Sequence, residues 1–105
     1  MTDKLLVLTT AGSEAEANKI AQALVERRLA ACVNIVPRIQ SVYRWRDQVE
    51  KSEEFLLLIK TKRGLEAELE AAIRELHSYE LPERVGLAIA SGSNEYLQWI
   101  DRSVT

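Results

Sequence analysis

The sequence predicts an α+β fold with the element order β-α-β-β-α-β and a helix at the C-terminal end. Short apolar runs at residues 5–10, 55–59 and 85–90 are typical of buried strands. The stretch from Cys32 to Trp45 alternates with a period of two, which indicates a longer strand. Apolar residues recur at helical spacing in the two segments that separate the strands. Two such β-α-β units joined by a hairpin form the ferredoxin-like arrangement, a two-layer sandwich with both helices on one face of an antiparallel sheet.

The first strand and the first helix have clear boundaries. The run from Leu5 to Thr10 is apolar on both faces, and Gly12 closes it. Ser13 and Glu16 have the spacing of a capping box, in which the serine accepts from a free helix amide and the glutamate reaches back. The helix that follows shows an apolar stripe with the i, i+3, i+4, i+7 pattern at Ala17, Ile20, Ala21 and Leu24.

The next two strands are predicted to form a hairpin. Alternation from Cys32 to Trp45 places these side chains on one face: Val33, Ile35, Ile39, Ser41, Tyr43 and Trp45. Pro37 cannot donate a ladder hydrogen bond, so we expect a bulge or an edge position there. Asp47-Gln48 is predicted to form the turn, and Val49 to Thr61 the returning strand.

The second half of the chain repeats the first unit. Leu65, Leu69, Ala72, Ile73 and Leu76 lie at helical spacing after Gly64. Pro82 forces the residue before it out of helical geometry, so the helix ends at or before the segment 77–83. We expect a fourth strand at residues 85–90, a turn at 91–93 and a final helix at 94–104.

Composition limits the classes of function. The 105 residues support one core, so we expect a single domain spanning 1–105. A net charge of −2 gives no electrostatic case for binding nucleic acid or an anionic membrane. One cysteine and one histidine exclude a Cys₄ or Cys₂His₂ zinc site. The apolar run 5–8 is shorter than the core of a signal peptide, so we expect a cytoplasmic protein.

The apolar strands predict an oligomer. Helices of a ferredoxin-like domain cover one face of the sheet, and the other face should therefore alternate to polar. The runs 5–8 and 55–59 do not alternate. Because soluble oligomers are mostly symmetric assemblies of identical chains, we expect an obligate homo-oligomer in which another copy covers this face.

His77 and Cys32 are the residues that could carry metal or nucleophile chemistry. His77 ends the second helix and could bind a metal or carry a proton, but an imidazole also suits the negative end of a helix. Cys32 opens a strand and fits a buried small hydrophobic residue better than a nucleophile. A Cys-His dyad stays open, although nothing in the sequence brings the two together. Motifs for a phosphate-binding loop or a Ser-His-Asp triad are absent.

An aromatic pocket is the other candidate site. Tyr43 and Trp45 are expected to share a strand face, with polar neighbours at Glu53, Lys60, Tyr79 and Glu83. The same residues fit a subunit interface, where tyrosine and tryptophan are enriched. Arg38, Arg44 and Arg46 form a basic row, but the nearby acidic residues cancel its charge.

Several motifs are specific when they are taken together and in order. They are Thr9-Thr10, LAACVNI at 29–35, SVYRW at 41–45, IKT at 59–61, HSYELPE at 77–83 and YLQWI at 96–100. Over essentially the whole chain, this set resembles the CutA family of divalent-cation tolerance proteins. The resemblance implies a ferredoxin-like protomer in a tight homotrimer similar in shape to PII signalling proteins. It also implies a role in divalent-metal tolerance, copper(II) binding and no established catalytic reaction.

The resemblance also gives expectations for the metal site. Family members with a described copper site use a cysteine at the end of the first strand and a His-His pair at the end of the second helix. This chain has Thr9 and Leu76-His77 at those positions. We therefore expect that it binds copper through His77 weakly or not at all, unless the trimer axis or a carboxylate such as Glu83 adds donors. Ser78 and Asp47 replace a usual proline and a usual hairpin glycine.

Three alternatives remain besides a non-enzymatic metal-tolerance protein. A PII-like small-molecule sensor would use a long mobile loop between the second and third strands, where this chain has a hairpin. An acylphosphatase-like enzyme would need a glycine-rich phosphate loop after the first strand, where residues 9–13 offer one glycine. The trimer could also serve as a stable scaffold for another protein.

Overall fold

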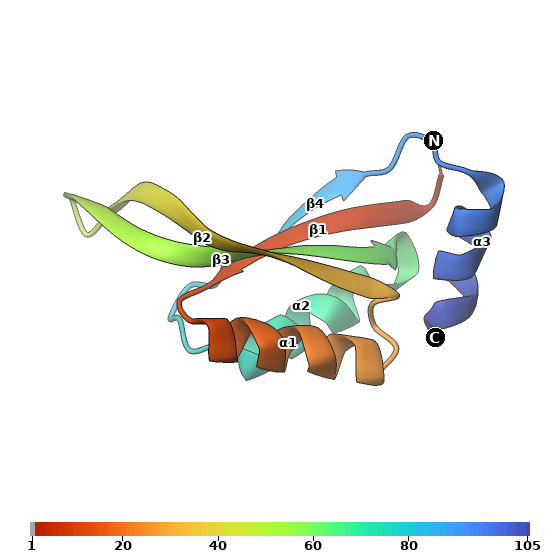
Figure 1. Cartoon of the computed structure of the whole chain (residues 1–105), viewed down its shortest axis with the longest axis horizontal. Helices are drawn as coiled ribbons and strands as arrows, with labels where there is room; N and C mark the ends of the chain where they lie inside the picture. The colour runs from red at the N-terminus through yellow and green to blue at the C-terminus, as the bar shows by residue number, and fades with distance from the viewer. Residues whose placement is uncertain (1) are drawn as a thin grey trace.

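The computed structural model describes residues 2–105. In this part of the chain, four strands form one antiparallel sheet in the order β2-β3-β1-β4. The predicted β-α-β-β-α-β order with a terminal helix is confirmed (Figure 1). The elements are β1 (Lys4–Ala11), α1 (Glu14–Glu26), β2 (Cys32–Trp45), β3 (Gln48–Lys62), a 3₁₀ turn (Arg63–Leu65), α2 (Glu66–Leu76), β4 (Val85–Ala88) and α3 (Asn94–Ser103).

The core lies between the sheet and the helices α1 and α2. Both helices cover the same face of the sheet, and α3 packs at one end of it (Figure 1). The predicted helical stripes are confirmed, since Ile20 and Leu24 of α1 and Leu69 and Ile73 of α2 are fully buried. They meet the alternate strand residues that point toward them, which are Leu5, Val7, Thr9, Phe55, Leu57, Ile59 and Thr61.

The start of α1 forms half of the predicted capping box. Ser13 Oγ accepts from the backbone amide of Glu16 at 3.2 Å. The Glu16 carboxylate instead points toward the His77 ring, where its Oε1 lies 3.4 Å from Nδ1. The serine cap therefore fixes the helix start, and the glutamate contacts the end of α2.

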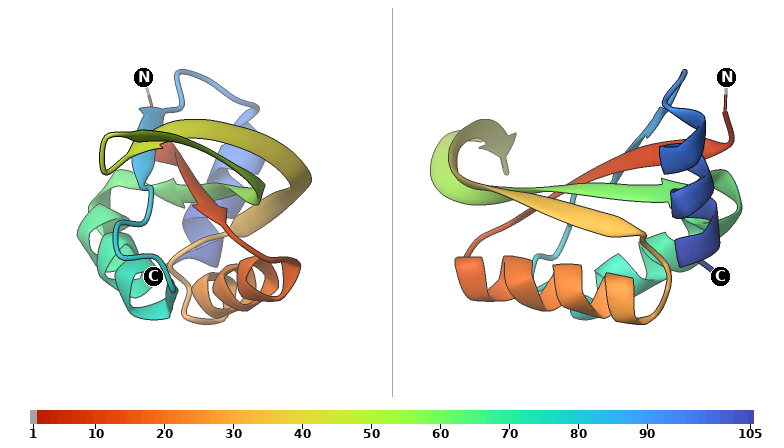
Figure 2. Two further views of the ribbon diagram at one scale, coloured as in Figure 1. Left: turned by 90° about the vertical axis from the view of Figure 1, so that its left-hand side faces the viewer. Right: turned by 45° about the vertical axis from the view of Figure 1, so that its right-hand side comes forward.

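The hairpin formed by β2 and β3 extends beyond the helices as an arm, defined here as residues 39–54. It stretches the molecule to 44 Å along its longest axis, and it twists and curls away from the body (Figure 2). The two-residue turn is Arg46-Asp47, because Trp45 pairs with Gln48 in the ladder. The prediction of a turn at Asp47-Gln48 was thus displaced by one residue.

A β-bulge at Pro37 changes which side chains share a face. The predicted bulge is confirmed, since the register shifts between Val36, which pairs with Leu56, and Ile39, which pairs with Glu54. The extra residue in β2 reverses the alternation beyond it. Val33 and Ile35 point toward the helices, whereas Ile39, Ser41, Tyr43 and Trp45 share the opposite face with Glu54. The prediction of one common face for all six residues was therefore wrong.

The face of the sheet opposite α1 and α2 is apolar, as the sequence predicts. We call this surface the open face; its central residues are Leu6, Leu8, Leu56, Leu58, Val85 and Leu87. Val85 and Leu87 are each 47% exposed, and no helix among residues 2–105 covers this face (Figure 1).

The fourth strand is shorter than predicted and ends at Ala88 rather than at residue 90. None of the helices in the described chain is long and apolar enough to span a membrane.

Candidate functional site

A cavity of about 590 Å³ lies where the arm joins the body. Strand β1 contributes Thr10, the arm contributes residues from both of its strands, and the loop between α2 and β4 closes the third side. We call this cavity the arm pocket. Its lining consists of Thr10, Ser41, Val42, Tyr43, Trp45, Glu54, Tyr79, Glu80, Leu81 and Glu83.

Four of the predicted pocket residues come together here: Tyr43, Trp45, Tyr79 and Glu83. Glu53 does not line the pocket, because adjacent residues of a strand point to opposite faces and Glu54 takes the inward position. Lys60 lies farther along β3, where it pairs with Cys32 and its ammonium contacts the side chain of Asn34. Glu53 and Lys60 are therefore not among the lining residues of the arm pocket.

Sequence reasoning missed Glu54, and the bulge explains why. Without a fixed register at Pro37, the sequence does not show whether Glu53 or Glu54 shares a face with Tyr43 and Trp45. The apolar run that follows could have identified Glu54. Phe55 and Leu57 of this run are core positions, so Glu54 must point away from the helices.

Glu54 and Tyr79 form the polar centre of the arm pocket. Glu54 is 7% exposed, and its Oε2 accepts a hydrogen bond of 2.7 Å from the Tyr79 hydroxyl. Burial, followed by this bond to a carboxylate, raises the pKa of Tyr79 well above its ordinary value. Tyr79 therefore stays protonated and acts as a donor to Glu54 at neutral pH.

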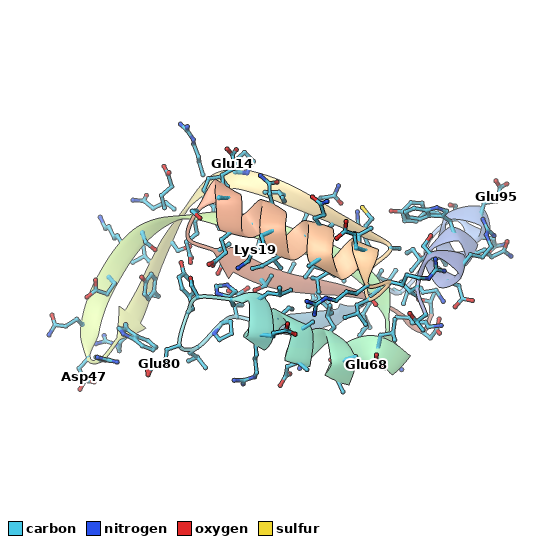
Figure 3. The ribbon with its side chains drawn as sticks, turned by 90° about the horizontal axis from the view of Figure 1, so that it is seen from below. Glu14, Lys19, Asp47, Glu68, Glu80 and Glu95 are labelled. Atoms are coloured by element: carbon cyan, nitrogen blue, oxygen red, sulfur yellow. The ribbon has the colours of Figure 1, made fainter. Side chains whose placement is uncertain are left out.

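Arg46 contacts two lining residues, Trp45 and Glu80, at the outer rim of the arm pocket. Its guanidinium carbon lies 5.5 Å from the centroid of the Trp45 ring, and its Nη2 lies 3.2 Å from Oε2 of Glu80. Figure 3 shows Glu80 at the same end of the molecule as Asp47, which marks the tip of the arm. The exposed ion pair with Glu80 thus joins the arm to the loop after α2, whereas the cation–π contact with Trp45 lies within the arm.

Both ring nitrogens of His77 contact backbone groups of the same chain. His77 is the C-cap of α2, and its side chain is fully buried. Its Nε2 lies 2.5 Å from the carbonyl oxygen of Thr10, and its Nδ1 accepts from the backbone amide of Tyr79 at 3.1 Å. A carbonyl only accepts and an amide N–H only donates, so these contacts assign the proton to Nε2. A metal would need one of these two nitrogens as a ligand.

Cys32 and His77 do not form a dyad. Cys32 pairs with Lys60, whereas His77 contacts Thr10, which pairs with Leu56 four residues away along β3. Four residues of strand correspond to about 13 Å. Cys32 is half-buried, and its Sγ faces Asn34 Oδ1 at 3.6 Å. Among residues 2–105, no group of three or more His, Cys, Asp or Glu side chains is placed to hold a metal ion.

The fold and the pocket together define a class of protein: a ferredoxin-like α+β domain with a long hairpin arm and an apolar sheet face left open. A family model described as CutA1 divalent ion tolerance protein matches residues 5–103. The chain therefore belongs to the CutA1 divalent ion tolerance protein family, and the resemblance found in the sequence is confirmed.

Relatives with curated names and solved structures agree with this family. The chain is 50% identical over 95 residues to the divalent-cation tolerance protein CutA of Thermus thermophilus, which covers 90% of this chain and 92% of the relative. It is 44% identical over 96 residues to human protein CutA, covering 91% of this chain and 53% of the relative, so it spans about half the human protein's length.

The solved structures match the whole fold. The structure of the Thermus thermophilus divalent cation tolerance protein superimposes with a TM-score of 0.95 and 47% identity, over 97% of this chain and 99% of that one. CutA from Xylella fastidiosa superimposes with a TM-score of 0.96 and 36% identity, over 99% of this chain and 100% of that one. The arm and the C-terminal helix are thus features of the family fold.

Proposed function

We propose that the chain is a homotrimeric, non-enzymatic divalent-cation tolerance protein of the cytoplasm. The observation that carries this proposal is the open face, which presents apolar side chains from β1, β3 and β4 to solvent in a single chain. The description of the family as divalent ion tolerance proteins supports the role in metal tolerance.

The free energy gained by removing the open face from water favours the proposed assembly. Each apolar side chain removed from water contributes about 1.5–3 kcal/mol when its burial is complete. Contiguous apolar patches of this kind on soluble proteins mark interaction sites. A closed ring of identical chains covers every open face with the same contact and leaves none exposed. We propose three copies, in an assembly shaped like the PII proteins, and the resemblance to the family supports this number.

The metal part of the proposal depends on His77. A copper ion at this ring must displace either the Thr10 carbonyl from Nε2 or the Tyr79 amide from Nδ1. Thr9 and Leu76 flank the site without offering a strong copper donor. We therefore propose that this chain takes up copper(II) weakly or not at all, with Glu16 Oε1 as the carboxylate oxygen nearest to Nδ1.

Native mass spectrometry of chelator-stripped protein tests assembly and metal binding together. We expect a trimer that remains largely free of metal after one equivalent of copper(II) per chain. If copper does bind, the His77→Ala variant should lose it, whereas Cys32→Ser, at the start of β2, should keep it. A stoichiometric copper complex that survives His77→Ala would show that the ligand lies elsewhere.

A PII-like small-molecule sensor is the second candidate function. The arm pocket favours it, because ligand sites are typically cavities of about 300–1,000 Å³ with apolar walls and a few convergent polar groups. A ligand that binds the native state must raise its melting temperature. A screen of nucleotides and small metabolites by thermal shift would therefore detect this function.

A further inference from the structure

We propose that the arm pocket binds a small organic cation, in which a guanidinium, amidinium or ammonium group is carried on an apolar or aromatic body. This inference deepens the second candidate function by naming its class of ligand, and it does not depend on metal binding. It rests on three observations: the acidic and aromatic residues of the lining, the burial of Glu54 without a basic partner, and the position of Arg46.

The lining combines negative charge with aromatic surface. Three carboxylates, those of Glu54, Glu80 and Glu83, and three aromatic rings, those of Tyr43, Trp45 and Tyr79, face the same cavity, and no lysine or arginine is among its lining residues. In a single chain the three rings are 37–43% exposed, so part of each is accessible before assembly. Aromatic faces and carboxylates together are the usual walls of sites for organic cations.

Glu54 is a buried carboxyl group without a basic side chain beside it in the described chain. It is 7% exposed, and within the described chain its side chain bonds only to the neutral Tyr79 hydroxyl. No lysine or arginine in residues 2–105 forms an ion pair with it, although such pairs occur elsewhere on the surface. Burying a carboxylate in this way is unfavourable unless a cation accompanies it. A bound cation would provide that partner.

Arg46 shows that the rim already accepts a guanidinium. Its side chain lies over the Trp45 ring and pairs with Glu80, which is the same combination of aromatic face and carboxylate. Deeper in the cavity, Tyr43, Tyr79 and Glu54 repeat this combination with no cation from the chain. The position of the Arg46 guanidinium at the rim therefore indicates that a cationic group of a ligand would fit beside Tyr43, Tyr79 and Glu54.

The same lining disfavours a bare metal ion. Divalent ions take several oxygen, nitrogen or sulfur ligands at short distance, and no group of three or more His, Cys, Asp or Glu is so placed among residues 2–105. Aromatic walls cannot serve as such ligands. An organic cation, which needs one carboxylate and a flat apolar surface, fits the cavity better.

Calorimetry with benzamidine and benzamide provides the test. The two molecules have nearly the same shape, but benzamidine carries a positive charge at neutral pH and benzamide does not. We expect benzamidine to bind the wild-type assembly, and benzamide to bind at least about tenfold more weakly, since it cannot form a charged hydrogen bond to a carboxylate. Added salt should weaken benzamidine binding.

Two adjacent residues give a matched pair of variants. Glu54→Gln keeps the shape of the side chain and removes its charge, so benzamidine affinity should fall about tenfold or more. Glu53→Gln removes the same charge one residue away on the other face of β3, and the affinity should be unchanged. If Glu54→Gln does not fold, Glu83→Gln in the exposed loop removes a second lining carboxylate and should also weaken binding.

Three results would overturn the proposal. They are equal binding of benzamidine and benzamide, equal effects of Glu53→Gln and Glu54→Gln, and the absence of benzamidine binding to a folded wild-type assembly. The last result would indicate that a basic side chain of a second copy fills the pocket. None of them bears on trimer formation, which native mass spectrometry measures separately.

Discussion

At the scale of single residues, the contact between Tyr79 and Glu54 organises the arm pocket. Its hydrogen bond joins the loop after α2 to the arm, and Gly12 lies against the hydroxyl end of the Tyr79 ring. A Cβ atom on Gly12 would lie 2.9 Å from the Tyr79 hydroxyl oxygen, which is too close for a stable contact. The absence of a side chain at residue 12 is therefore a packing requirement rather than a requirement for backbone flexibility.

We expect Gly12→Ala to destabilise the protein by about 1–2 kcal/mol through this overlap. In a Tyr79→Phe background the added methyl group meets no hydroxyl, so the cost of the same substitution should fall by about 1 kcal/mol. Urea unfolding at one protein concentration measures both values. Gly64→Ala is the control, because nothing lies within 4 Å of its added Cβ, and additive effects of Gly12→Ala and Tyr79→Phe would contradict this account.

Tyr79 also predicts how stability changes in alkali. Its pKa is raised by burial and by Glu54, so between about pH 10 and its folded pKa only the unfolded chain loses this proton. The contribution of Tyr79 to stability is complete below about pH 10 and is lost as the pH rises toward the folded pKa. Unfolding at increasing pH should therefore show a steeper loss for wild type than for Tyr79→Phe, and parallel curves would contradict the raised pKa.

At the scale of elements, the bulge at Pro37 and the turn at Arg46-Asp47 place the arm. The bulge directs Tyr43 and Trp45 to the face of Glu54. The turn has a positive φ at both central residues, 52° at Arg46 and 66° at Asp47. A two-residue hairpin turn with positive φ at both positions is of type I′, for which glycine is favoured at the second position.

Asp47→Gly should therefore stabilise the arm relative to Asp47→Ala, by about 1 kcal/mol in the free energy of unfolding. Glycine adopts the left-handed conformation without a steric cost, whereas alanine does not. Hydrogen exchange of the arm amides, compared between the two variants, localises the effect. Equal stability of the two variants would show that the turn is not held in this conformation.

Local patterns were enough to predict the elements, but they did not fix the pairing of side chains across the bulge. The stripes of α1 and α2, the cap at Ser13 and the irregularity at Pro37 all follow from local chemistry. The face on which Tyr43 lies depends on where the extra residue sits in the ladder, and that position is set by strand pairing. The engagement of His77 by Thr10 is a contact between residues 67 positions apart, which no local pattern reveals.

At the scale of the whole molecule, the open face is the surface on which the proposed oligomeric state depends. Leu58 lies near its centre, between Leu8 on β1 and Asn34 on β2. The helices form the core on one side of the sheet only, and in the proposed trimer another copy covers and stabilises the other side. Stability measured at different protein concentrations should therefore differ, because assembly and folding are linked.

Leu58→Glu should dissociate the assembly by placing an unpaired carboxylate in the centre of the covered face. Val49→Glu is the matched control, since Val49 is 65% exposed on the arm and lies outside the open face. Size-exclusion chromatography with light scattering should give a smaller species for Leu58→Glu and the wild-type mass for Val49→Glu. If Val49→Glu dissociated the assembly and Leu58→Glu did not, the interface would lie on the arm and not on the open face.

Sedimentation equilibrium of the wild-type chain, from low to high micromolar concentration, tests whether the chain forms a trimer. We predict a single species of three times the chain mass over this range, because separating the copies would expose every open face to water. A monomer at any of these concentrations, or a dimer as the largest species, would contradict the proposed trimer.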